Sequence, residues 1–291
     1  MKEITIVSGK GGTGKTSVAA ALASIAKNVV FCDNDVDAAD LHLIFHPEIK
    51  ETYRFSSGSK AVIFPGKCTD CGLCEEYCRF DAIHPNKTGK REVNPFLCEG
   101  CRVCERICPE HAITVIESNN NFWYVSETRF GILVHAKMGP GEENSGKLVT
   151  EVRRKAKEIA AETNADYVIN DGPPGIGCAA IASVTGTDLV LMVIEPTLSG
   201  LHDAKRMMDL VKTFKIPVLA IINKYDINPE ITGAVECYLA EKQIALVGKL
   251  PFAAEMVQSM VKGKTVVEFD PDQIISREFF YVWESIENSL R

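Results

Sequence analysis

The sequence has no apolar run near the roughly 18 residues that a membrane-spanning helix needs, although 46% of its 291 residues are hydrophobic. Its opening also lacks the uninterrupted apolar stretch of a signal peptide, because a glycine-rich segment begins at Ser8. We therefore expect a cytoplasmic protein without stable membrane association. The apolar content is ample for a core, and the length suits one large or two smaller domains.

An excess of basic charge is also absent, since 32 Lys and Arg stand against 39 Asp and Glu for a net charge of −7. A nucleic-acid-binding surface needs a basic face, so nucleic acid is not expected as a partner. The segment 275–291 is aromatic but carries Glu278, Glu284 and Glu287 and few basic residues. Such a helix is not drawn to anionic lipid, so we predict that it packs against the protein.

A glycine-rich segment, SGKGGTGKT from Ser8 to Thr16, lies between a β-branched strand pattern and an alanine-rich helix pattern. Glycines permit backbone conformations closed to other residues, so successive N–H groups can converge on one phosphate at the positive end of the following helix. Lys15 would reach the β- and γ-phosphates, and Thr16 would bind Mg²⁺. The predicted nucleotide-binding residues in this loop are Gly9, Lys10, Gly11, Gly12, Thr13, Gly14, Lys15, Thr16 and Ser17.

Acidic residues follow two predicted strands. The apolar segment 29–32 leads to Asp33 and Asp35, and the segment 167–170 leads to Asp171. Open α/β sheets bind ligands at the carboxyl ends of their parallel strands, so these carboxylates are candidate ligand-binding residues, and Asp171 before its glycine-flanked turn suits a partner of Mg²⁺. Helix caps or plain turns are the alternative interpretations.

Eight of the 11 cysteines lie between Cys68 and Cys108. In a chain that is not expected to be exported, this clustering indicates metal binding rather than disulfides. Two copies of the C-x2-C-x2-C-x3-C run of bacterial ferredoxins occur there, in which three cysteines hold one 4Fe-4S cube and the fourth ligates the other. The predicted ligand sets are Cys68, Cys71, Cys74 and Cys108 for one cluster and Cys98, Cys101, Cys104 and Cys78 for the other.

Matching segments follow the two cysteine runs, FDAI from Phe80 and EHAI from Glu110, which supports an internal pseudo-twofold. Zinc is the alternative metal for these cysteines, but a zinc site needs only four ligands and no such internal repeat. The first run departs from the ferredoxin pattern at Arg79, where proline is expected. Charge close to the sulfurs sets the potential of a cluster, so Arg79 could expose or tune the neighbouring one.

The string KGGTGKT, from Lys10 to Thr16, resembles the deviant P-loop of the MinD, Mrp, ParA and nitrogenase iron protein superfamily. The whole chain is similar to the subgroup with an inserted two-cluster ferredoxin domain. The resemblance implies ATP-dependent dimerisation, in which Lys10 crosses to the partner's nucleotide and Asp35 orients the attacking water. It assigns catalysis to Lys10, Lys15, Asp35 and Asp171, the Mg²⁺ shell to Thr16, Asp33 and Asp171, and adenine recognition to Asn223, with the loop at Pro251 beside it.

Strand and helix patterns alternate outside the cysteine region, and the segments 189–194 and 216–222 are apolar runs typical of strands covered on both faces. We predict an α/β fold with a mostly parallel sheet of P-loop NTPase type and an inserted bacterial-type 2[4Fe-4S] ferredoxin-like domain. The deviant P-loop ATPase domain would comprise residues 1–60 and 118–291, and the ferredoxin-like domain residues 61–117.

Two further features have competing interpretations. Residues 141–147 mimic a second P-loop, but Leu148 replaces the Mg²⁺-binding hydroxyl, so we interpret them as a decoy in which Ser145 caps a helix. Cys178 follows the glycine turn after Asp171 and resembles the cluster ligand of the nitrogenase iron protein. A small buried cysteine is the interpretation that we favour for it.

Together these features predict a Mg²⁺-dependent, nucleotide-switched dimeric ATPase that couples ATP turnover to electron delivery. The expected cofactors are ATP, Mg²⁺ and two 4Fe-4S clusters. The expected partners are a second copy or a paralogous ATPase, and a redox protein or metal-cofactor assembly protein. The alternatives are an iron–sulfur scaffold or carrier of Mrp type, and a MinD-like positioning or regulatory ATPase with structural or sensory clusters.

Overall fold

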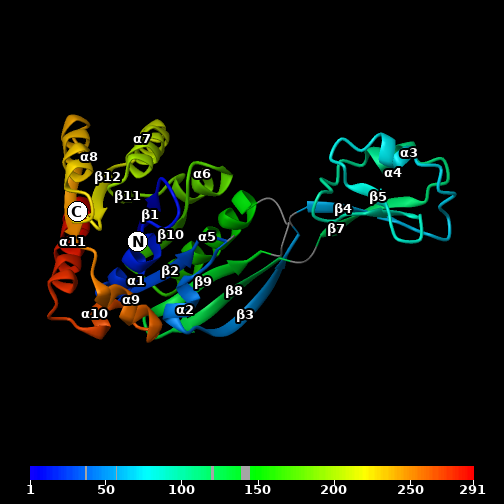
Figure 1. Cartoon of the computed structure of the whole chain (residues 1–291). Helices are drawn as coiled ribbons and strands as arrows, with labels where there is room; N and C mark the ends of the chain where they lie inside the picture. The colour runs from blue at the N-terminus through cyan, green and yellow to red at the C-terminus, as the bar shows by residue number, and fades with distance from the viewer. Residues whose placement is uncertain (37, 57, 119–120, 139–144) are drawn as a thin grey trace. The chain divides into compact units, whose positions relative to one another are not determined.

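The computed structural model describes residues 1–36, 38–56, 58–118, 121–138 and 145–291. They form two compact units, whose elements are labelled in Figure 1. The first unit comprises Met1–Thr52, Trp123–Ala136 and Gly146–Arg291, and the second comprises Tyr53–Phe122 and Lys137–Ser145. The second unit is thus wider than the predicted insertion of 61–117, and the ferredoxin-like identity of that insertion stays a prediction.

A nine-stranded sheet with the order β13-β12-β11-β1-β10-β2-β9-β8-β3 organises the first unit. All neighbouring strands from β13 to β9 are parallel, which confirms the predicted α/β fold with a mostly parallel sheet. The apolar run predicted at 189–194 is β11, and every one of its residues is buried. The strands are β1 Lys2–Ser8, β2 Val29–Asp33, β3 Glu48–Phe55, β8 Asn121–Thr128, β9 Gly131–Lys137, β10 Tyr167–Pro174, β11 Leu189–Ile194, β12 Val218–Asn223 and β13 Ala245–Leu250.

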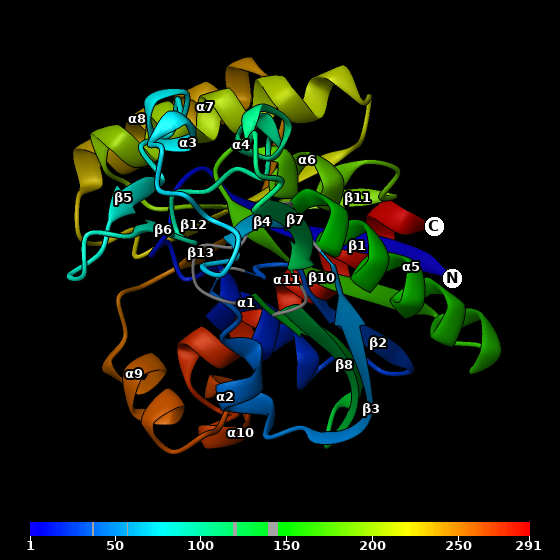
Figure 2. The ribbon, with the colours of Figure 1, turned by 90° about the vertical axis from the view of Figure 1, so that its right-hand side faces the viewer.

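Helices cover both faces of this sheet, as Figure 2 shows from a second direction. The core on one face includes residues of α1, α2, α10 and α11, and the core on the other includes residues of α6, α7 and α8. The helices of the first unit are α1 Lys15–Ala23, α2 Leu41–Phe45, α5 Ser145–Glu162, α6 Cys178–Val184, α7 Leu198–Thr213, α8 Pro229–Glu241, α9 Ala254–Val261, α10 Val266–Phe269 and α11 Ile274–Leu290.

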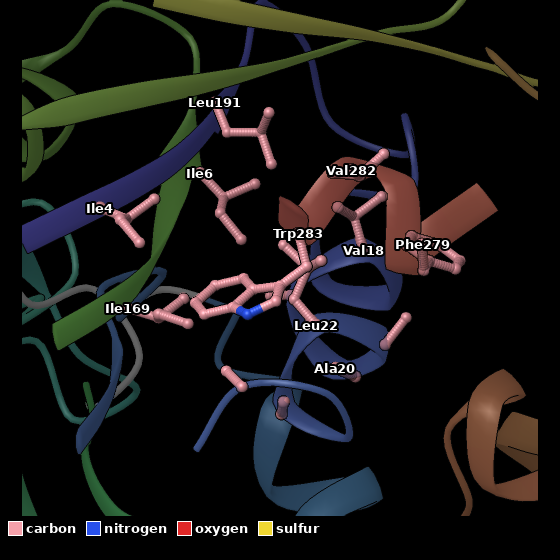
Figure 3. Close-up of a cluster of buried hydrophobic side chains, with 14 of the residues drawn as sticks. Ile4, Ile6, Val18, Ala20, Leu22, Ile169, Leu191, Phe279, Val282 and Trp283 are labelled. Carbon is pink, nitrogen blue, oxygen red and sulfur yellow. The ribbon is translucent and has the colours of Figure 1, made fainter. Parts of the chain in front are cut away.

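The last helix, α11, packs into the larger of these cores. Figure 3 shows Trp283 beside Leu22 of α1 and Ile169 of β10, with Phe279 and Val282 on the same helix. The side chains of these α11 residues are buried, so the predicted packing role of the segment 275–291 is confirmed. Across the described ranges of the chain, no helix is both long and apolar enough to cross a membrane.

The second unit contains two short antiparallel pairs, β4 Gly58–Ile63 with β7 Ile113–Ser118 and β5 Ile83–Pro85 with β6 Arg91–Val93. Two single-turn helices, α3 Leu73–Glu76 and α4 Val103–Ile107, follow the starts of the two cysteine runs. Left-handed backbone recurs at the same distance from the first cysteine of each run, which is the signature of an internal repeat. The matched positions are Asp70 and Gly100, Gly72 and Arg102, and Asp81 and His111.

Candidate nucleotide and cysteine sites

Lys15, the first residue of α1, is surrounded by carboxylates. Its Nζ lies 2.7 Å from Oδ1 of Asp171 and 3.6 Å from Oδ2 of Asp35. Burial disfavours the charged form of Lys15 and would lower its pKa. The negative charges of Asp171 and Asp35 outweigh this effect of burial, so the pKa of Lys15 lies above its usual value. The structure therefore brings together Lys15, Asp35 and Asp171, three of the residues that the sequence singled out for catalysis.

The sequence predicts that Asp171 directly follows a strand that ends at residue 170. In the structure, Asp171 lies inside β10. The strand continues to Pro174 because the parallel ladder extends past residue 170, and it pairs Asp171 with Asp33 of β2 and with Ile6 of β1. This register sets the two aspartates next to each other at the carboxyl edge of the sheet, where α/β proteins bind ligands.

Asp33 is fully buried beside this cluster. Its carboxylate accepts hydrogen bonds of 3.2 Å from the backbone N–H groups of Asp35 and Leu41. Burial raises the pKa of Asp33 well above its usual value, and the nearby charge of Asp171 acts in the same direction against that of Lys15. Three carboxyl groups thus lie around Lys15, and burial together with the charge of Asp171 favours the neutral form of Asp33.

These residues fit a Mg²⁺–nucleotide. Among the described residues, Oδ2 of Asp171 and Oγ1 of Thr13 are buried atoms without a hydrogen-bond partner, and a bound ion with its waters or a phosphate would provide one. No three His, Cys, Asp or Glu side chains in the described part of the chain are placed to hold a metal ion by themselves. Magnesium at such sites characteristically takes only one or two carboxylates and completes its shell with waters and phosphates.

Lys10 points back to its own chain. Its Nζ lies 2.8 Å from Oε2 of Glu195 and 2.9 Å from Oγ1 of Thr197, the N-cap residue of α7. The other oxygen of Glu195 lies 2.8 Å from Nζ of Lys224, which also donates to the carbonyl of Gly12. Burial alone would raise the pKa of Glu195, but the bonds from Lys10 and Lys224 hold it below its usual value.

Asn223, at the end of β12, binds the glycine loop. Its Nδ2 donates to the carbonyl of Thr13 at 2.7 Å, and a Cβ added to Gly14 would lie 2.3 Å from that nitrogen. Gly14 also has a φ of +90°, so both its backbone and its neighbour require glycine. Pro251 directly follows β13 and is half-buried.

The remaining loop residues differ in their surroundings. Gly9 packs so tightly against α7 that an added Cβ would lie 2.3 Å from the backbone of Asp203, whereas Gly11 and Gly12 are exposed. Thr16 and Ser17 lie in the first turn of α1, where Oγ of Ser17 donates to Sδ of Met260 at 3.4 Å. Thr16 is half-buried beside the cluster residue Lys15.

The eight cysteines of the second unit line two separate hollows. One hollow is lined by Cys68, Cys71, Cys74 and Cys108, which we call the first cysteine site. The other is lined by Cys98, Cys101, Cys104 and Cys78, the second cysteine site. Each hollow thus receives three thiols from one run and the fourth from the other, which is the exchange that the ferredoxin pattern predicts, and four thiols around a hollow fit a 4Fe-4S cube.

Backbone N–H groups point at the sulfurs in both sites. Ala112 donates to Cys108 at 3.3 Å and Ala82 donates to Cys78 at 3.4 Å, so the pseudo-twofold extends to these bonds. Burial raises the pKa of the Cys104 thiol to about 11. Loading a metal group that needs thiolates must therefore release protons.

Two sequence interpretations need comment. The prediction that Cys178 is buried is wrong, since Cys178 is exposed as the first residue of α6, directly after Gly177. Its neighbour is Gly146 of α5, where an added Cβ would lie 3.1 Å from Cβ of Cys178. Most of the decoy segment 141–147 lies outside the described residues, and α5 begins at Ser145.

Sequence reasoning missed Glu195 and Lys224 as parts of the nucleotide site. Their position carried a usable signal, since Glu195 directly follows β11 and Lys224 directly follows β12, at the same sheet edge as Asp33. A charged residue directly after an apolar strand is the same pattern that marks Asp33 and Asp35 as candidates.

The parallel sheet, the glycine loop and the lysine set among aspartates define a P-loop nucleotide-binding protein. A family model described as the CobQ/CobB/MinD/ParA nucleotide binding domain matches residues 4–270, so the chain belongs to this family.

Similar proteins include an uncharacterized protein of Methanocaldococcus jannaschii, 36% identical over 78% of this chain and 79% of that protein. The iron-sulfur cluster carrier protein of Pyrococcus abyssi is 22% identical over 99% of this chain and 86% of that protein. Among solved structures, the septum site-determining protein MinD of Pyrococcus horikoshii complexed with Mg-ADP aligns with a TM-score of 0.59 and 18% identity, covering 98% of this chain and 96% of that one. This structural likeness supports the fold alone.

Proposed function

We propose that the protein is a Mg²⁺-dependent ATPase that carries two 4Fe-4S clusters and couples ATP turnover to electron delivery. The observation that carries this function is the gathering of two complete four-cysteine sets in a chain that also holds a P-loop cluster. The electron acceptor would be a metalloprotein or a metal-cofactor assembly partner. When bound, the clusters would supply low-potential electrons, and the eight cysteines would hold them.

In the nucleotide site, Lys15 would bind the β- and γ-phosphates, and Thr16, Asp33 and Asp171 would contribute to the Mg²⁺ shell. The phosphates would draw Lys15 from Asp171, which it contacts at 2.7 Å. Asp35, 3.6 Å from the same ammonium, would orient the attacking water. Asn223 and the loop at Pro251 would border the adenine.

Lys10 would act between two copies of the chain or between this chain and a paralogous ATPase. It is bound to Glu195 and Thr197 of its own chain, and 27% of its side chain is exposed, so it can exchange these partners for a phosphate. Closure of the dimer would then depend on the γ-phosphate. Release of phosphate would return Lys10 to Glu195.

The test is an anaerobic comparison of the wild type with Asp35→Ala. The variant should bind ATP, lose at least 100-fold in hydrolysis, and accumulate as an ATP-bound dimer in size-exclusion chromatography with light scattering. Asp40→Ala is the matched control, because Asp40 is exposed and its side chain caps no N–H group of α2. An Asp35→Ala protein that stays monomeric with ATP bound would contradict the role of Asp35.

Coupling has its own measurement. Reduced wild-type protein should reduce an acceptor metalloprotein faster with ATP than with ADP, at equal cluster content. Equal rates with the two nucleotides would remove electron gating from the function, whatever the ATPase activity.

A second function, cluster transfer, is favoured by the names of relatives such as the iron-sulfur cluster carrier protein of Pyrococcus abyssi. The commitment of all eight cysteines to two full sets argues for retained clusters. Incubation of the loaded protein with a cluster-free acceptor separates the two functions, since loss of iron and sulfide from this chain supports transfer and retention supports electron delivery.

A further inference from the structure

The two cysteine sites are related by the internal repeat, so each residue around one site has a counterpart around the other. Counted from the first cysteine of each run, Asp70 corresponds to Gly100 and Gly72 to Arg102. Counted from the last cysteine, Glu110 corresponds to Phe80. All six residues line their hollows, which allows the charge around the two sites to be compared position by position.

The first cysteine site is the more acidic of the two. Asp70 and Glu110 line it, and its one lining cation, Arg91, lies 3.2 Å from Asp70 and 3.0 Å from Glu75. The charge of Arg91 is therefore already compensated. Electrons added to a group in this site would meet an excess of negative charge.

The second cysteine site has a more positive lining. Arg102 takes the position of Gly72, and Gly100 and Phe80 replace the two carboxylates. Glu99 lines the hollow as well, so the positive charge of Arg102 is balanced by one lining carboxylate. Arg102 also pairs with Glu105 at 3.3 Å, and Arg102 therefore brings the charge around the second site only close to neutral.

Strand β4 adds a cation to the second site. Nζ of Lys60 donates to the carbonyl of Cys98 at 2.9 Å, and the backbone N–H of Ala61 donates to Sγ of Cys98 at 3.3 Å. A positive charge and a donated hydrogen bond at a ligating cysteine both stabilise the more negative, reduced state of a cluster. The counterpart Cys68 of the first site accepts a bond of 3.4 Å from the backbone N–H of Asp70, so the donor is matched there and the charge of Lys60 is the difference that β4 makes.

We infer that Lys60, Arg102 and the smaller number of lining carboxylates make a cluster in the second cysteine site easier to reduce than one in the first. This inference rests on the proposed clusters and adds the order in which they are reduced. At partial reduction the electron resides at the second site, whose rim carries the exposed Phe80 and Val103. The acidic first site stays oxidised until the potential is lowered further.

The test is a redox titration of the loaded full-length protein, followed by electron paramagnetic resonance with dithionite as the reductant. The wild type should show two separate midpoint potentials. Lys60→Met should shift only the higher one to a more negative value, and Asp70→Asn should shift only the lower one to a more positive value, so each variant narrows the gap from a different side. Lys90→Met is the control, because Lys90 lines the same groove as Lys60, and among the described residues its side chain bonds to no cysteine.

Iron and acid-labile sulfide are measured in every sample. If they are absent from the wild type, the proposed clusters fail, and with them the function. If two clusters are present but titrate together, or if Lys60→Met moves the lower potential or neither, the inferred order is wrong while the proposed function stands. Either variant alone is sufficient for the test if the other fails to fold.

Discussion

The nucleotide site and the cysteine sites are built in different ways. Residues far apart in the chain meet in the first, where Asn223 binds the carbonyl of Thr13 across 210 positions. Each cysteine site instead takes three of its four thiols from one window of seven residues, such as 68–74. One site therefore needs the whole parallel sheet in place before it exists, whereas most of the other is specified by a local run.

The cores of the two units also differ, in the size and type of the side chains that they bury. In the first unit, large apolar residues such as Phe31, Phe45 and Phe279 are fully buried. The buried cluster of the second unit consists of small or aliphatic residues and two of the cysteines themselves, namely Ala61, Cys74, Ala82, Ile83, Cys98, Ile113 and Val115. We therefore predict that the first unit is stabilised by its own side chains and that the second depends on the clusters proposed for its cysteines.

Removal of the proposed clusters should have the largest effect, and this effect should be confined to the second unit. Anaerobic treatment with an iron chelator is expected to abolish almost all amide protection from β4 to β7, Gly58–Ser118, because a metal group that binds only the folded state provides folding free energy. Hydrogen exchange followed by mass spectrometry measures this, with the segments Met1–Thr52 and Gly146–Arg291 as the internal control. Persistent protection in the second unit would show that its apolar core is sufficient.

The substitution Lys15→Ala should affect the first unit and leave the second unchanged, the reverse of cluster removal. Nucleotide affinity should fall at least 100-fold, and the free energy of unfolding of the first unit should fall by about 3 kcal/mol, since a buried pair loses one partner. Fluorescence titration and urea denaturation measure the two effects. Lys242→Ala is the control, because it removes only a surface pair with Glu241 and should change neither the nucleotide affinity nor the free energy of unfolding. An unaltered nucleotide affinity in Lys15→Ala would disprove the assigned phosphate contact.

The smallest expected effect is a loss of stability in acid that arises in the first unit. Burial, with a smaller contribution from His42, lowers the pKa of His135 from 6.5 to about 4. The folded state favours the neutral ring, so the stabilisation is complete above pH 6.5 and is lost as the pH falls toward 4, with about 2 kcal/mol gone by pH 5.

Urea denaturation at pH 7 and pH 5 measures this loss. His135→Gln should flatten the difference between the two pH values, because glutamine keeps a polar nitrogen for Oγ of Ser126, which His135 contacts at 3.0 Å, and does not titrate. His84→Gln in the second unit is the control, since His84 is exposed. An undiminished pH difference in His135→Gln would assign the acid sensitivity to other groups.

Local patterns in the sequence were sufficient to predict the glycine loop, the parallel sheet and Lys15 as a site residue. The strand before the loop and the helix after it are formed by consecutive residues whose apolar spacing is readable. The partners of Lys10 could not be predicted, because Glu195 and Thr197 reach it only when β11 lies beside β1. The exposure of Cys178 could not be predicted either, because the burial of the first residue of α6 depends on which elements pack around it.

The sequence by itself determined which residue types are available for phosphate and for metal, because those types and spacings follow from the chemistry of the ligands. Only the tertiary structure decided which charges surround them. The register of β10 against β2 sets Asp171 beside Asp33, and the position of β4 brings Nζ of Lys60 to the carbonyl of Cys98. Charge acts through space, and the distances between elements far apart in the chain exist only in the folded protein.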